Sequence, residues 1–189
     1  MKRKKSNTAN RICGIDPGTN VMGYAILDQN DRQLTIVDLG TLYMKKLESQ
    51  EDKLHRILTG VREIMQKYNP AECSVEAPFY GKNVQSMLKL GRAQGVAIAA
   101  AMVENVTIRE YSPKKIKMAI TGNGNAAKEQ VKGMLEQLLN CSLEEYPLDA
   151  TDALAAAVCH AYRRNNPRMT DDQFKGWGDF LKRNPGRMK

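Results

Sequence analysis

Four carboxylic acids in this 189-residue sequence stand at positions where such side chains can do chemistry. Asp16 ends an apolar stretch directly before a Pro-Gly turn, and Glu76 ends a second apolar stretch before Ala-Pro. If these stretches are neighbouring parallel strands, both acids lie at the edge where open α/β sheets bind their ligands. Asp149 and Asp152 are three residues apart, so they share one face at the start of a helix.

Carboxylates held close together repel one another, which raises their pKa values until a cation relieves the repulsion. A hard divalent cation, Mg²⁺ or alternatively Mn²⁺, takes carboxylate oxygens as ligands. Two such ions about 4 Å apart can activate a water and stabilise the leaving oxygen in phosphodiester cleavage. The four acids therefore predict a hydrolytic site with two ions per subunit. His55 and His160 each lie alone on a helix and are interpreted as structural.

The pair at the helix start has a simpler alternative interpretation. Asp149 taken alone could be an N-cap, because helix N-termini favour acidic side chains. That alternative does not explain Asp152, which directly precedes the apolar run 153–158.

The net charge of +8 is unevenly distributed along the chain. Residues 1–11 hold five Lys or Arg and no acid, and residues 165–189 hold six basic and three acidic residues. The body is neutral, but its segment 82–132 has nine basic residues and three acids. A basic zone beside an acidic cluster fits a polyanionic ligand, whereas the alternative is a lysine-rich surface that only maintains solubility.

Apolar periodicity and turn signals predict the elements that must position these residues. The order indicates three antiparallel strands, then alternating helices and strands, then helices. This pattern predicts an α/β fold, a mixed sheet of three antiparallel plus two parallel strands with helices on both faces. The expected strands are 11–16, 21–27, 34–43, 72–76 and 107–111, and the expected helices are 52–68, 84–105, 113–121, 126–139 and 149–163.

Several classes of protein are excluded by composition. The longest strictly apolar run, 96–103, is far shorter than the ~20 residues of a membrane span. Residues 1–11 are basic, but no apolar segment follows, so they do not form a secretory signal. The four cysteines show neither zinc-ligand nor paired spacing and are interpreted as thiols in a reducing cytoplasm.

Four segments together resemble the RuvC family of Holliday junction resolvases. They are ICGIDPGTNVMGY at 12–24, VEAPF at 75–79, LKLGRAQGVA at 88–97 and LDATDALA at 148–155. Their order and spacing match the family over 12–164. The resemblance implies a ribonuclease H-like nuclease domain at 12–164, a basic arm at 1–11 and a polar tail at 165–189.

The resemblance also implies a function. The expected protein is a cytoplasmic homodimer that resolves four-way DNA junctions by paired, Mg²⁺-dependent nicks in recombination and repair, with the RuvA–RuvB branch-migration complex as partner. The family's catalytic and metal-binding carboxylates correspond to the four acids already singled out. This chain departs from the family at Asn20, where a basic residue is common. The expected DNA-binding residues are Phe79, Lys82, Lys117 and Lys128.

Two segments keep a structural alternative. Phe79 lies on a polar loop where it could stack on an unpaired base, or it could be a core aromatic. The helix 84–105 is rich in small residues, which fits either an internal helix or the dimer interface that the resemblance implies.

Two other functions compete with the nuclease. The segment 16–19 resembles the phosphate loop of actin-like ATPases, but those proteins need two such domains, and this chain has room for one. A nuclease-dead junction-binding protein would lack at least one of the four acids, and all four are present.

Overall fold

The computed structural model describes residues 10–78 and 83–164. Its centre is a five-stranded sheet with the order β3-β2-β1-β4-β5. The pairs β1–β2 and β2–β3 are antiparallel, whereas β1–β4 and β4–β5 are parallel, as predicted. The strands are β1 (Arg11–Asp16), β2 (Val21–Asn30), β3 (Gln33–Tyr43), β4 (Glu72–Glu76) and β5 (Thr107–Tyr111).

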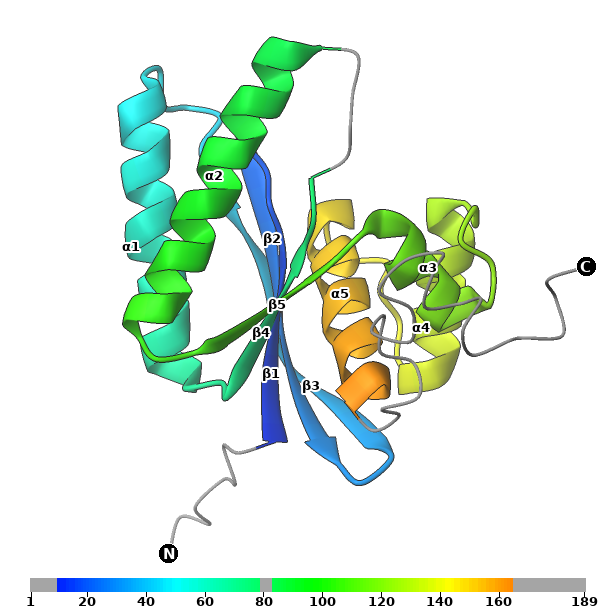
Figure 1. Cartoon of the computed structure of the whole chain (residues 1–189). Coiled ribbons are helices and arrows are strands. Elements are labelled where there is room, and N and C mark those ends of the chain that lie inside the picture. Colours follow the sequence, from blue (N-terminus) through cyan, green and yellow to red (C-terminus); the bar gives the residue numbers. More distant parts are fainter. Residues whose placement is uncertain (1–9, 79–82, 165–189) are drawn as a thin grey trace, which may run out of the picture.

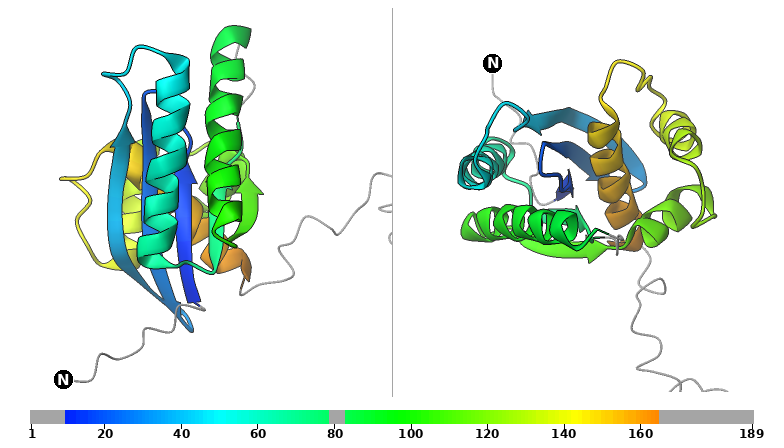
Figure 2. Two further views of the ribbon diagram at one scale, coloured as in Figure 1. Left: turned by 90° about the vertical axis from the view of Figure 1, so that its left-hand side faces the viewer. Right: turned by 90° about the horizontal axis from the view of Figure 1, so that it is seen from above.

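Helices cover both faces of this sheet, so the central strands are buried on two sides. The helices that precede β5 in the chain pack on one face, and those that follow β5 lie on the other (Figures 1 and 2). Two separate hydrophobic clusters fill the spaces between sheet and helices. The helices are α1 (Gln50–Tyr68), α2 (Val84–Val103), α3 (Pro113–Thr121), α4 (Lys128–Leu139) and α5 (Leu148–Arg164).

Side-chain alternation along β1 and β4 determines which residues face which helices. Cys13 and Ile15 of β1, like Cys73 and Val75 of β4, belong to the cluster under α1 and α2. Ile12 belongs to the other cluster, beneath α5. The alternate positions of both strands, including their last residues, therefore face α5.

Two glycines allow α5 to lie directly on the sheet. A Cβ atom on Gly14 of β1 would be 2.0 Å from the backbone oxygen of Ala153. A Cβ on Gly23 of β2 would be 1.8 Å from the backbone oxygen of Asp149. Any larger residue would push α5 away, so these glycines set how closely the start of α5 approaches the strand ends.

Six of the ten predicted elements differ from the observed ones by one to three residues at one or both ends, and two of these differences have a clear local cause. β2 continues to Asn30 because the hairpin turn is tight, with Asp31 at a φ of 55°. α4 begins at Lys128, since Ala127 is extended and serves as its N-cap.

His160 and three of the four cysteines are buried, as expected of structural residues, whereas Cys141 is only partly buried. All four cysteines are free, and Cys13, Cys73 and Cys159 are buried. His160 is buried between the Tyr111 hydroxyl, 2.7 Å from Nδ1, and the Glu72 carboxylate, 2.9 Å from Nε2. Within 10–78 and 83–164, no helix is long and apolar enough to cross a membrane.

Candidate active site

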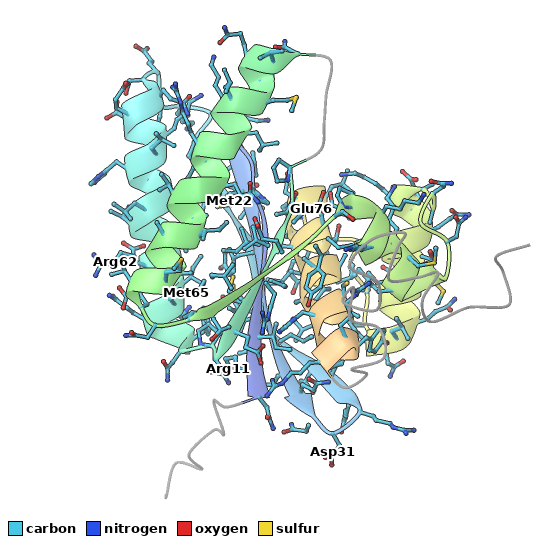
Figure 3. All side chains as sticks on the ribbon, viewed as in Figure 1. Arg11, Met22, Asp31, Arg62, Met65 and Glu76 are labelled. Carbon is cyan, nitrogen blue, oxygen red and sulfur yellow. The ribbon has the colours of Figure 1, made fainter. Side chains whose placement is uncertain are left out.

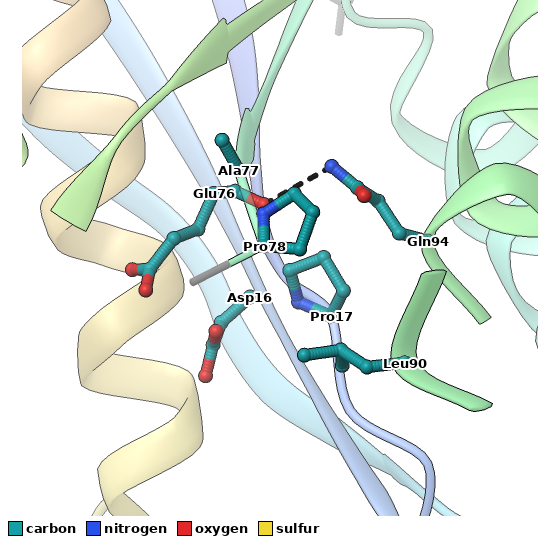
Figure 4. Close-up of a pocket in the computed structure, with 7 residues that line it drawn as sticks. All are labelled: Asp16, Pro17, Glu76, Ala77, Pro78, Leu90 and Gln94. Carbon is teal, nitrogen blue, oxygen red and sulfur yellow. Dashed lines mark hydrogen bonds between the residues drawn. The ribbon is translucent and has the colours of Figure 1, made fainter. Parts of the chain in front are cut away.

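Asp16 and Glu76 lie side by side at one edge of the sheet. Ile15 of β1 and Val75 of β4 are register partners, and each acid is the next residue of its strand. Both carboxylates project toward α5 (Figure 4). Glu76 lies at the end of the sheet opposite Arg11 and Asp31 (Figure 3). The predicted juxtaposition of the two strand-end acids is therefore present.

The other two acids come to the same edge on α5. The Pro147 carbonyl accepts a hydrogen bond from the Thr151 amide at 3.2 Å, so Pro147 precedes the first helical turn. Asp149 lies inside that turn and is not the N-cap, which excludes the alternative interpretation. The backbone of Asp149 lies against Gly23, which is the register partner of Asp16, and Asp152 lines the same cavity as Glu76, so all four acids lie close together.

The electrostatics of the cluster are unfavourable without a compensating cation. Burial raises the pKa of Asp16 to about 8, and the charges of the other three acids contribute to this shift. Burial also raises the pKa of Glu76 to about 7, with a further contribution from Asp152. Near neutral pH, carboxylates in such a site keep their full charge only when a positive group offsets it.

Two lysines supply positive charge beside the acids. The Lys128 ammonium forms an ion pair with the Asp152 carboxylate. Lys128 and Lys117 both lower the pKa of Glu76, against the larger effect of burial. The two lysines and two of the acids line a cavity of about 320 Å³, together with Pro113, Ile116, Val131 and Ala155.

A smaller cavity of about 100 Å³ lies on the other side of Glu76, toward α2, and Gln94 lines it. Gln94 is 6% exposed, and its Nε2 donates to the Glu76 carbonyl at 3.3 Å (Figure 4). The same Nε2 also donates to Glu110 Oε1 at 2.7 Å. Gln94 therefore holds the backbone of a site residue from the far face of the sheet. This role of Gln94 was not predicted from the sequence. The signal that could have indicated it is a polar residue on the buried face of an apolar helix.

A second contact near the site was also missed. Lys53 of α1 donates from Nζ to Asn20 Oδ1 at 2.8 Å. Asn20 lies in the turn that follows Asp16, so this contact brings a positive charge to the position where the resembled family often has a basic residue.

The donor set fits a hard divalent cation. The four side chains offer oxygen ligands alone, and burial with mutual repulsion favours a compensating positive charge. Among residues 10–78 and 83–164, no three Asp, Glu, His or Cys side chains are already arranged around an ion position. The charges are assembled at one edge, while Asp152 is engaged by a lysine.

Phe79 and Lys82, both expected to bind DNA, lie outside the described residues. The structure therefore places two of the four expected DNA-binding residues, Lys117 and Lys128, at the site.

The sheet has the mixed order β3-β2-β1-β4-β5, and acids end its neighbouring parallel strands β1 and β4. Further acids lie on α5, the helix that packs across these strands. This fold and this site together define a ribonuclease H-like nuclease. The sequence model described as "Crossover junction endodeoxyribonuclease RuvC" matches residues 12–160. The chain belongs to the RuvC family of crossover junction endodeoxyribonucleases.

Individual relatives agree with this assignment. The protein of that name from Cytophaga hutchinsonii is 46% identical over 192 residues, covering 100% of this chain and 94% of the relative. The Bacteroides fragilis protein is 49% identical over 180 residues, covering 94% and 95%. The solved structure of T. thermophilus RuvC in complex with Holliday junction substrate has a TM-score of 0.76 at 28% identity, covering 82% of this chain and 94% of its own. Family membership favours a junction endonuclease over the ATPase and the nuclease-dead alternatives.

Proposed function

We propose that Asp16, Glu76, Asp149 and Asp152 form the hydrolytic centre with which this endonuclease nicks four-way DNA junctions. The observation that carries the proposal is the convergence of all four acids, from two strands and one helix, beside two lysines at one sheet edge. A phosphodiester enters such a site only if its negative charge is offset, and the lysines and a bound cation serve that purpose.

The four carboxylates are the groups that would hold divalent cations, Mg²⁺ in the first instance. When bound, the cation supplies charge neutralisation and an activated water for phosphodiester hydrolysis. The proposal is supported by the all-oxygen donor set and by the raised pKa values of Asp16 and Glu76. The strand ends hold two of these carboxylates on rigid backbone, so the site is preorganised on its sheet side.

The lysines are proposed to bind the junction backbone. Lys117 and Lys128 line the cavity that contains Glu76 and Asp152, so a phosphate there would lie between the basic and acidic groups. Phosphate contacts position DNA without reading its sequence. By family resemblance, Phe79 and Lys82 are proposed to contact the junction near the crossover, with Phe79 stacking on an unpaired base.

Paired nicks require two active sites, and we propose that a homodimer supplies them through a two-fold axis. α2 carries an exposed apolar stripe on the face turned away from the sheet. Val84, Leu88 and Met102 are 66%, 55% and 60% exposed, and Gly91 and Gly95 lie between them. Beyond the adjoining backbone of α2 itself, a Cβ atom on either glycine would meet no atom within 4 Å, so packing within one subunit does not require glycine there. This supports α2 as the dimer contact.

The expected domain division, with nuclease residues 12–164 between a basic arm and a polar tail, remains part of the proposal. So do action in the cytoplasm and cooperation with the RuvA–RuvB complex, which rest on the family resemblance.

Incubation with a synthetic four-way junction tests the proposed function. With Mg²⁺, the protein should nick two opposed strands of the junction and leave a linear duplex of the same sequence intact. Addition of EDTA should stop cleavage, while junction binding in a gel-shift assay persists. Equal cleavage of junction and duplex, or cleavage that is unaffected by EDTA, would contradict the proposal.

A further inference from the structure

The ion pair between Lys128 and Asp152 joins two groups to which the proposed function gives different partners. Asp152 is a proposed metal ligand, and Lys128 is a proposed phosphate contact. In this structure they bind each other, the lysine from the first residue of α4 and the acid from the first turns of α5. A metal ion at Asp152 would therefore meet the positive charge of Lys128, and a phosphate at Lys128 would meet the negative charge of Asp152.

The Lys128 ammonium interacts with most of the acidic cluster. Burial lowers the pKa of Lys128, but the hydrogen bond to Asp152 and two further carboxylate charges raise it above its ordinary value. Those further charges belong to Asp16 and Glu76. The ammonium pairs with Asp152 and lines the same cavity as Glu76, so it supplies positive charge where a bound cation would.

The geometry allows the lysine to leave. The Lys128 side chain is 57% exposed and that of Asp152 is 22% exposed, so solvent reaches the pair from the lysine side. Lysine is a point charge on a flexible four-carbon stem, and its ammonium can move several ångströms at little cost. Lys128 also lines the cavity of about 320 Å³, into which the ammonium can turn without leaving the site.

We propose that Lys128 is a built-in counter-cation that competes with the divalent metal for Asp152, and that its release by the metal makes it available to the DNA phosphate. This inference rests on the proposed function, because it takes Asp152 as a metal ligand. Coupling of this kind is reciprocal: whatever the metal adds to junction affinity through Lys128, the junction adds to metal affinity.

Metal binding without DNA tests the competition directly. We would measure the dissociation constant of Mn²⁺ by calorimetry for the full-length wild type, for Lys128→Met and for Lys132→Met. Lys132 lies on the same helix but does not line the cavity. Removal of the competing ammonium should tighten Mn²⁺ binding by about twofold to fivefold in Lys128→Met, the range expected for loss of a partly exposed ion pair. Lys132→Met should bind Mn²⁺ like the wild type. Unchanged or weaker Mn²⁺ binding by Lys128→Met would overturn the inference.

The reciprocal arm uses junction affinity. Lys128→Met should lose more affinity for a four-way junction in Ca²⁺ than in EDTA, since the wild-type lysine is released only when the metal is bound. Lys132→Met should show the same small loss in both conditions. A loss for Lys128→Met that is independent of Ca²⁺ would contradict the coupling.

The same titration separates failure of this inference from failure of the proposed function. If the wild type binds Mn²⁺ and Asp152→Asn does not, Asp152 is a metal ligand, and this conclusion does not depend on the Mn²⁺ affinity of Lys128→Met. If the wild type and Asp152→Asn bind Mn²⁺ equally, Asp152 is not a ligand, and both proposals fail.

Discussion

Asp16 and Glu76 are neighbours because each directly follows one member of a register pair in two parallel strands. Ile15 and Val75 pair across β1 and β4, and side-chain alternation turns the next residue of each strand toward α5. The backbone of a central sheet therefore holds these two acids, and the glycines beneath α5 let the remaining acids approach.

The first prediction concerns the four acids. Asp16→Asn, Glu76→Gln, Asp149→Asn and Asp152→Asn should each reduce junction cleavage by about 10³-fold or more, because each removes a proposed metal-ligand charge. Junction affinity should change by less than about threefold, since phosphate contacts dominate DNA binding. Single-turnover cleavage and gel-shift titration measure the two quantities. A variant that cleaves at near the wild-type rate would show that its acid is not a ligand.

The second prediction concerns pH and stability without metal. Folding raises the pKa of Asp16 from 3.8 to about 8 and that of Glu76 from 4.5 to about 7, chiefly through burial. As pH rises, the two carboxyl groups therefore lose their protons at lower pH in the unfolded chain than in the folded protein. Their contribution to the free energy of unfolding is full below about pH 4 and is lost by about pH 8. In EDTA, the melting temperature of the wild type should fall relative to that of Asp16→Asn between pH 5.5 and 8.5.

At pH 8, Asp16→Asn should melt higher than the wild type by roughly 2–6 °C in EDTA. Groups common to both proteins, including His160, cancel in this difference. Mg²⁺ should raise the melting temperature of the wild type more than that of the variant. If the difference in melting temperature between the two proteins stayed constant across this pH range, the surroundings of Asp16 would not raise the pKa of its carboxyl group.

A third prediction concerns assembly through α2. Wild-type protein should sediment at about twice 21.2 kDa at micromolar concentration. Gly95→Glu puts a charge at the centre of the exposed stripe, and because nothing lies within 4 Å of its Cβ position, the subunit should remain folded as a monomer. Gly133→Glu on α4 is the matched control, since its Cβ position is equally open, and it should remain dimeric. If Gly95→Glu stays dimeric, the contact lies elsewhere.

The fourth prediction concerns Lys117. Lys117→Met should weaken junction binding and reduce the log–log salt slope by about 0.9, the value for one lost phosphate contact on duplex DNA. The loss should be the same on junctions of different sequence. Lys114→Met, an exposed lysine on the same helix that does not line the cavity, provides the comparison. If the two substitutions had equal effects on junction binding, Lys117 would be an ordinary surface charge and not a specific phosphate contact.

The sheet and the four acids could be predicted because the information for them is local. Asp16 and Glu76 each end an apolar run before a turn, and Asp149 and Asp152 show helical spacing at the start of another run. Strand pairing then brings the two strand ends to one edge. The same local signals predicted every helix and strand, with boundary differences of a few residues.

The contacts that complete the site could not be predicted, because they join distant segments. The hydrogen bonds of Gln94 to Glu76 and of Lys53 to Asn20 depend on how α2 and α1 pack against the sheet. The pairing of Lys128 with Asp152 likewise depends on the relative placement of α4 and α5.

Cleavage of a cruciform on a supercoiled plasmid tests the central claim most directly. The first nick releases the supercoiling that maintains the cruciform, so linear DNA forms only if the second strand is cut within the lifetime of the same complex. With Mg²⁺, the wild type should convert supercoiled plasmid to linear product without accumulation of nicked circles, and Asp16→Asn should give neither product. Nicked circles as the main product, or linear DNA from Asp16→Asn, would contradict a paired-nick mechanism at the four-carboxylate site.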